Sequence, residues 1–269
     1  MNKKLATIIT INFMMFCWTS GTFAQSPYEF SWGKDGAIFG TAAISGIAAG
    51  IIISQVDALT EAQINALDRN DVNAFDRSAT FNFSETADAI SDVTAIACLG
   101  ISAALLTSKN VRNDFRTFAI MYSQMLIFAS ALPSISKGLT KRARPFVYNE
   151  DAPFAKKLNK SSRLAFFSGH TTNAFAGAIF FATTFSDYFP KSKFKPYIWG
   201  GSIVLASVVA VTRVEAGRHY RTDVIAGAIV GSAIGYFVPR LHRRSKFNGL
   251  SVSPLYKDRQ MQIGVNYSF

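Results

Sequence analysis

Three short segments of this chain combine cations, imidazoles and a carboxylate at spacings that could bind and attack an anion. They are KGLTKRARP at residues 137–145, SGH at residues 168–170 and TRVEAGRHYRTD at residues 212–223. Arginine can hold two oxygens of a phosphate at once, lysine acts as a point charge, and histidine is a nucleophile or an acid near neutral pH. The three segments therefore predict a site at which a phosphate group is held and attacked.

The first segment supplies two cations. Lys137 and Arg144 are seven residues apart, close to two helical turns, so both would project from one face if the helix continues. Pro145 then marks the end of the helix. Two cations on one face would bind an anion, although a basic loop against lipid headgroups explains the same residues when they are taken alone.

The second segment precedes an apolar stretch of helical length. The first backbone N–H groups of a helix have no partners within the helix and attract anions. Gly169 would let the backbone approach an anion closely, Ser168 would add a hydroxyl, and His170 follows them. Taken alone, a Ser-Gly helix cap with an incidental histidine is the simpler interpretation.

The third segment places His219 and Asp223 four residues apart, on one face of a helix, with Arg213 six residues before the histidine. A carboxylate bonded to one imidazole nitrogen would fix the tautomer and leave the other nitrogen free to attack. An ion pair at the surface of a helix start is the alternative interpretation.

Together the segments resemble the three-part signature of the type-2 phosphatidic acid phosphatase and haloperoxidase superfamily, which reads K-x6-R-P, P-S-G-H and S-R-x5-H-x3-D. Every internal spacing agrees, while Phe167 stands where the family has proline and Thr212 where it has serine. The motifs cover residues 137–223, and the pattern of apolar segments extends the resemblance to residues 36–238.

The resemblance implies a mechanism and a role for each residue. His219 would attack the phosphorus and form a phosphohistidine, with Asp223 orienting its ring. His170 would protonate the leaving oxygen and later activate water. The groups that hold the equatorial oxygens would be Lys137, Arg144, Arg213, Ser168 and Gly169. No metal and no cofactor are expected.

Composition and patterning predict an all-α, six-helix bundle of the membrane type. Hydrophobic residues make up 49% of the chain and charged residues 17%, below the roughly 25% charged residues of a typical soluble domain. Glycine, alanine, serine and threonine are frequent in the apolar segments and would let helices pack closely. These segments are residues 36–54, 93–107, 118–135, 170–185, 197–211 and 224–238.

The two ends of the chain differ from its middle. Residues 1–24 resemble a secretory signal peptide, with Lys3 and Lys4 before an apolar run and Ala24 at its end. The phosphatase-like domain is then expected over residues 25–247. Residues 248–269 alternate between apolar and polar, which predicts a short tail like a β-hairpin, with a break at Pro254.

Charge indicates where the protein acts. The net charge of +11 favours anionic partners, and we find no pattern typical of nucleic-acid binding, so a membrane and a lipid phosphate are the expected partners. The three segments would share one side of the bundle, and the connections on the other side are basic. Because basic loops prefer the cytoplasm, the site is expected to face the periplasm from the inner membrane of a bacterial-type envelope.

One observation opposes that orientation. A cleaved signal followed by six spans would turn the site toward the cytoplasm. Either one early segment does not span, the signal is not processed in the usual way, or the charge rule fails here. Residues 93–107, with Asp92 at their edge and an apolar run of only about 15 residues, are the candidate for a segment too short to span. The periplasm and the outer membrane are the alternative locations.

The predicted function is metal-independent hydrolysis of a phosphate monoester or pyrophosphate on a lipid such as phosphatidate, undecaprenyl pyrophosphate, phosphatidylglycerol phosphate or lipid A. A periplasmic acid phosphatase acting on soluble esters, a vanadate-dependent haloperoxidase with vanadate on His219, and a membrane scaffold without activity are the alternatives. The sequence predicts neither the headgroup nor the oligomeric state.

Overall fold

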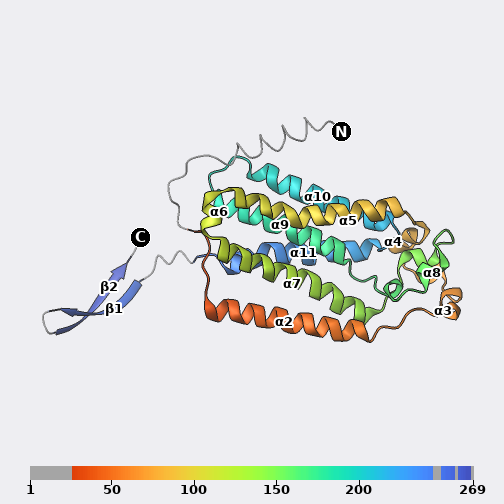
Figure 1. The fold of residues 1–269 in the computed structure, drawn as a ribbon, viewed down its shortest axis with the longest axis horizontal. Coiled ribbons are helices and arrows are strands. Elements are labelled where there is room, and N and C mark those ends of the chain that lie inside the picture. Colours follow the sequence, from red (N-terminus) through yellow and green to blue (C-terminus); the bar gives the residue numbers. More distant parts are fainter. Residues whose placement is uncertain (1–25, 245–249, 258–259, 268–269) are drawn as a thin grey trace.

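The computed structural model describes residues 26–244, 250–257 and 260–267. The predicted signal peptide at residues 1–24 lies outside the described residues. The predicted all-α membrane-type bundle is confirmed (Figure 1). Its long helices are α2 (Trp32–Ser54), α5 (Glu85–Gly100), α7 (Phe115–Thr140), α9 (Gly169–Tyr188), α10 (Lys195–Glu215) and α11 (Arg221–Leu241).

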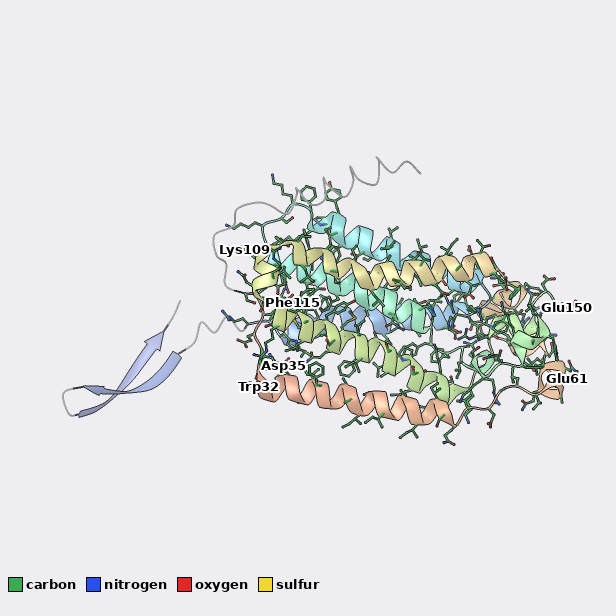
Figure 2. The ribbon with its side chains drawn as sticks, in the orientation of Figure 1. Trp32, Asp35, Glu61, Lys109, Phe115 and Glu150 are labelled. Atoms are coloured by element: carbon green, nitrogen blue, oxygen red, sulfur yellow. The ribbon has the colours of Figure 1, made fainter. Side chains whose placement is uncertain are left out.

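Short helices fill the connections. Figure 1 shows α3, α4 and α8 at one end of the bundle and α6 at the other, and in Figure 2 Glu61 and Glu150 mark the first of these ends. The short elements are α3 (Glu61–Asn65), η1 (Arg69–Asp71), α4 (Ala74–Arg77), η2 (Ser78–Phe81), η3 (Ile101–Thr107), α6 (Lys109–Asn113), η4 (Pro145–Tyr148), α8 (Phe154–Lys157) and η5 (Lys160–Arg163).

Helix α5 begins earlier than the apolar segment at residues 93–107 predicted. The Ser84 hydroxyl accepts a hydrogen bond from the Ala87 N–H at 3.1 Å, and Glu85 and Asp88 lie in the first turn, where negative charge stabilises a helix. Together with η3 the helical stretch Glu85–Thr107 has 23 residues and is long and apolar enough to cross a membrane. The premise that this segment is too short to span was therefore wrong.

Helix α9 forms the centre of the bundle. It packs against α11, α10, α5 and α7, and most of its residues are buried. Phe180 of α9 and Met121 and Met125 of α7 are fully buried in the main hydrophobic core. On the α11 side, a methyl group at Gly231 would lie well inside contact distance of the Thr172 carbonyl oxygen, so the absence of a side chain permits this close approach.

Five helical stretches among the described residues are long and apolar enough to span a membrane: Trp32–Ser54, Glu85–Thr107, Phe115–Tyr148, Lys195–Glu215 and Arg221–Leu241. Large apolar side chains are exposed on their outer faces, among them Ile44, Val93, Val204 and Ile229. Such a surface suits contact with lipid chains rather than with water.

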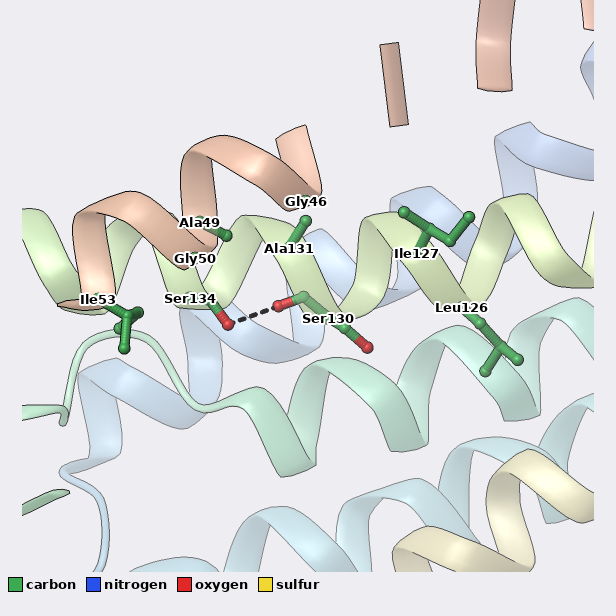
Figure 3. Close-up of a pocket in the computed structure, with 9 residues that line it drawn as sticks. All are labelled: Gly46, Ala49, Gly50, Ile53, Leu126, Ile127, Ser130, Ala131 and Ser134. Carbon is green, nitrogen blue, oxygen red and sulfur yellow. Dashed lines mark hydrogen bonds between the residues drawn. The ribbon is translucent and has the colours of Figure 1, made fainter. Parts of the chain in front are cut away.

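A groove of about 580 Å³ separates part of α2 from α7 (Figure 3). Its last residue on α7 is Ser134, which lies about one helical turn before Lys137. The groove is therefore apolar for most of its length and ends near a residue of the first motif. Its lining residues are Gly46, Ala49, Gly50, Ile53, Leu126, Ile127, Ser130, Ala131 and Ser134.

The last part of the chain contains two antiparallel strands, β1 (Leu250–Lys257) and β2 (Gln260–Tyr267), with Leu250 opposite Tyr267. β1 continues through Pro254, where the sequence predicted a break. Both strands of a two-stranded sheet are edge strands, and an edge tolerates a residue that has no N–H to donate.

Candidate active site

The three motif segments meet at one end of the bundle, as the sequence predicted from their positions. The long helices alternate in direction, so the end of α7, the start of α9, the end of α10 and the start of α11 lie at the same end. Backbone hydrogen bonds join the segments directly. The Ala165 N–H donates to the Arg142 carbonyl at 3.1 Å, and the Ser168 N–H donates to the Asp223 carbonyl at 3.1 Å.

His219 is fully buried at the centre of this end. Its Nδ1 lies 2.8 Å from the Ala165 carbonyl oxygen. Because a carbonyl can only accept, Nδ1 carries the proton and Nε2 carries a lone pair. Nε2 is buried without a hydrogen-bond partner among the described residues. A buried nitrogen with a free lone pair is the arrangement that a nucleophile requires.

Asp223 lies in the site but contacts the ring differently from the sequence prediction. Its Oδ2 is 3.5 Å from His219 Nδ1 and accepts a hydrogen bond from the Tyr220 N–H at 2.9 Å. Helix α11 begins at Arg221, so His219 precedes the helix and the two residues do not share a helix face. The Ala165 carbonyl fixes the tautomer, and Asp223 supplies a buried negative charge beside the ring.

Lys137 and Arg144 also reach the site by a different route from the predicted one. Helix α7 ends at Thr140, and Lys141 adopts a left-handed conformation with φ of 47°, so the helix does not continue to Arg144. The condition for a shared helix face, a helix that continues to Arg144, is therefore not met. Lys137 nevertheless lies against the start of α9, because a Cβ atom at Gly169 would be 3.0 Å from its Nζ.

Arg144 and Arg213 are both buried, and the Nε of each lacks a hydrogen-bond partner among the described residues. Together with Lys137 they place positive charge around His219. Buried donors without partners cost free energy unless a ligand or water satisfies them. The cluster therefore favours the binding of an anion.

Ser168 is the N-cap of α9. Its Oγ accepts from the Thr171 N–H at 3.3 Å and lies 2.9 Å from the Thr171 hydroxyl. The helix-cap interpretation of the SGH segment therefore holds for this serine. The helix cap is also compatible with the anion-site interpretation, because it brings the start of α9 next to Lys137. The peptide bond between Phe166 and Phe167, which precedes this cap, is cis.

Sequence reasoning missed Asp88. Its carboxylate lies 2.6 Å from Arg213 and also forms an ion pair with Arg218. One clue was the charge imbalance, since residues 55–89 hold seven acidic residues and two arginines while the motif segments are rich in cations. These residues lie between the first two predicted apolar segments, and their end forms the first part of α5.

A second missed pair, Asp76 and Arg142, supports Asp223. Arg142 donates to Asp223 at 2.7 Å and to Asp76 at 2.8 Å, and its guanidinium lies 3.8 Å from the centre of the Tyr220 ring. Burial alone would raise the pKa of Asp76, but hydrogen bonds from Arg142 and Thr222 outweigh it and lower this pKa below its usual range. Asp76 therefore stays ionised and holds Arg142 against Asp223.

His170 is the most accessible of the predicted catalytic residues, with 41% of its side chain exposed, and its Nε2 lies 3.0 Å from Asp92 Oδ1.

Among residues 26–244 no cluster of three or more His, Cys, Asp or Glu side chains has the arrangement to bind a metal ion. All eight predicted site residues lie at the end of the bundle at which the three segments meet.

The chain is similar to known lipid phosphatases. The family model described as the PAP2 superfamily matches residues 118–247. A lipid A 4'-phosphatase from Porphyromonas gingivalis is 32% identical over 131 residues, which are 47% of this chain and 52% of that protein. An undecaprenyl-diphosphatase from Sulfolobus acidocaldarius is 29% identical over 161 residues, or 60% and 67% of the two chains.

The chain thus spans about half the length of the first relative and two thirds of the second. Among solved structures, a PAP2-type phosphatidylglycerolphosphate phosphatase from Bacillus subtilis is 21% identical, with a TM-score of 0.42, over 77% of this chain and 94% of that one.

The neutral state of His219 can be measured directly. Burial, and after it the positive charges of Arg144, Arg213, Lys137 and His170, hold the pKa of His219 well below its usual range. In nitrogen-15 NMR spectra of detergent-solubilised protein labelled at histidine, its ring should keep neutral shifts from pH ~7.5 to ~5.5, a range in which an ordinary histidine titrates. A His219→Ala variant assigns the signal. Titration of this ring near its ordinary pKa would contradict the expected environment.

Proposed function

We propose that this chain, whose residues 118–247 belong to the PAP2 superfamily, is a phosphatase that removes phosphate from a lipid monoester or pyrophosphate without a metal, through a phosphohistidine on His219. One observation carries the proposal. The unpartnered Nε2 of His219 lies in a buried, positively charged site in which the Nε groups of Arg144 and Arg213 also lack partners. A phosphate group supplies the missing acceptors and the electrophile.

In the first chemical step, Nε2 of His219 attacks the phosphorus while the Ala165 carbonyl keeps the proton on Nδ1. The ring becomes positively charged as the N–P bond forms, and the nearby Asp223 carboxylate stabilises that charge. Three cations would hold the equatorial oxygens as charge moves in the transition state: Lys137, Arg144 and Arg213.

In the same step the bond to the leaving oxygen breaks, and His170 donates a proton to that oxygen. In the second step a water molecule gives a proton to His170 and attacks the phosphohistidine, which releases phosphate and restores His219. Asp88 keeps Arg213 in place through both steps, since its carboxylate lies 2.6 Å from that guanidinium.

The apolar bundle favours a lipid over a soluble ester. The site lies at the end of helices that are long and apolar enough to span a membrane, where a phosphate attached to a lipid would be presented. The groove between α2 and α7 (Figure 3) ends about one turn from Lys137, so a hydrocarbon chain bound in it would lie beside the phosphate. The relatives that act on lipid A and undecaprenyl diphosphate support the same class of substrate.

The basic connections around α6 and after α11 lie at the opposite end of the bundle from the site. Because such connections prefer the cytoplasm, we place the site on the periplasmic side of the inner membrane of a bacterial-type cell.

Phosphate release by detergent-purified protein with EDTA present tests the function. The substrates are phosphatidate, undecaprenyl pyrophosphate, lipid A and 4-nitrophenyl phosphate. We expect release from at least one lipid, and a loss of at least about 10³-fold in His219→Ala, because the nucleophile is removed. A wild-type protein that is folded and releases no phosphate from any of them would refute the proposal. Equal release by wild type and variant would refute the role of His219.

Filling the groove should separate lipid from soluble substrates. Gly50 lines the groove, and a Cβ atom there would meet no other atom within 4 Å, so we expect Gly50→Leu to fill part of the groove with little disturbance of packing. We expect kcat/KM for a long-chain lipid phosphate to fall about 10-fold, the loss that ~1.4 kcal/mol of binding energy represents, with 4-nitrophenyl phosphate hydrolysis unchanged. Gly40→Leu is the matched control, since Gly40 is on the same helix, also faces open space and lies outside the groove. Unchanged lipid hydrolysis in Gly50→Leu would exclude the groove as the binding site for the hydrocarbon chain of the lipid.

A further inference from the structure

Asp92 contacts two residues of the site, although no motif contains it. It lies in α5 one turn after Asp88, and its Oδ1 is 3.0 Å from Nε2 of His170 and 3.5 Å from a terminal nitrogen of Arg213. Its side chain is 54% exposed and that of His170 is 41% exposed, so both are more accessible than the buried nucleophile His219. The contact therefore joins α5 to α9 where the leaving group can reach it.

The surroundings of His170 are otherwise unfavourable to a general acid. Positive charge reaches its ring from Lys137 of α7, from Arg144 of the following loop and from Arg213 of α10, and His219 faces it from the loop before α11. Burial and, after it, these charges hold the pKa of His170 below its usual range, yet a general acid must be protonated before it can donate.

Two carboxylates of α5 face His170 from the other side. Asp88 acts on the ring at longer range and is already bonded to Arg213 and Arg218. Asp92 is the one whose oxygen lies within hydrogen-bond distance of the ring. A carboxylate at this distance favours the protonated imidazole and fixes the orientation of the ring.

We propose that Asp92 is a positioning residue that orients His170 and favours its protonated form as the acid for the leaving group. The inference rests on the proposed phosphatase function. As the N–P bond to His219 forms, the electron pair of the breaking P–O bond goes to the leaving oxygen. That oxygen takes one ring proton of His170, while the Asp92 carboxylate stays beside the nitrogen that carries the other. In the second step the proton of the attacking water returns to His170, which restores the pair.

The Asp92→Asn variant tests the inference, because it removes the charge and keeps the size of the side chain. A lipid alkoxide is a poor leaving group that needs the proton, whereas 4-nitrophenolate leaves without one. We expect kcat/KM for a lipid phosphate, which reports the step that forms the phosphohistidine, to fall about 10- to 100-fold, part of the ~10²- to 10⁴-fold that a general acid contributes. The kcat/KM for 4-nitrophenyl phosphate should change less than about 2-fold, a factor equivalent to ~0.4 kcal/mol.

The pH dependence gives a second readout that a merely structural role would not change. Without the carboxylate, His170 loses its proton at lower pH, so the alkaline limb of kcat/KM for the lipid should move to lower pH. In a His170→Ala background, Asp92→Asn should cause little further loss, because the two residues act as one unit. Glu85→Gln is the matched control: Glu85 is an exposed carboxylate of the same helix, paired with Lys156, and its removal should leave both substrates unaffected.

Three results would overturn the inference. An equal loss on both substrates would indicate a structural role. A lower KM with an unmoved pH profile would show that Asp92 competes with phosphate for Arg213. Additive losses in the double variant would show that Asp92 does not act through His170. Absence of phosphate release by the wild type would overturn the proposed function as well, so the two failures can be distinguished.

Discussion

The structure depends on holding several positive side chains together in a buried site without neutralising all of them. Lys137, Arg144 and Arg213 all act on the fully buried His219. Like charges repel more strongly in a protein interior than in water, so such a cluster forms only where the surrounding structure fixes it. Asp88 and Asp223 each compensate part of the charge, and the remainder is available to an anion.

The packing of the bundle provides that fixed surrounding. Helix α9 is enclosed by four neighbours, and the close approach of α11 at Gly231 leaves little freedom for the two helices to slide. Because the backbone of Ser168 is bonded to that of Asp223, the start of α9 and the start of α11 are positioned together. The tautomer of His219 is then set by a hydrogen bond to a backbone group, the carbonyl of Ala165.

The elements that the sequence predicted best were those with a repeated local signal. Long apolar segments predicted the bundle, and the spacing of the three motifs predicted which end would hold Lys137, His170 and His219. The contacts between residues within that end of the bundle were harder to predict from the sequence. Lys141 ends helix α7 by adopting a left-handed conformation. The sequence does not predict this, because the residue at that position is neither glycine nor proline.

The contacts that sequence reasoning missed are of long range. Asp76 and Asp88 come from the acidic connection and from the polar first turns of α5, and their partners Arg142 and Arg213 lie far along the chain. Excess acid in one segment and excess base in another indicates that ion pairs form between them. It does not indicate which residues pair, because that depends on how the connection between α2 and α5 folds over the site.

Trapping the covalent intermediate would test the role of His219 as the nucleophile. Protein mixed with a phosphorus-32-labelled lipid phosphate is quenched in alkali within milliseconds, digested and analysed by mass spectrometry, since phosphohistidine survives alkali and is lost in acid. We expect label on the peptide that contains His219, and none when His219→Ala is treated in the same way. Turnover without a labelled protein, or label on any other residue, would contradict it.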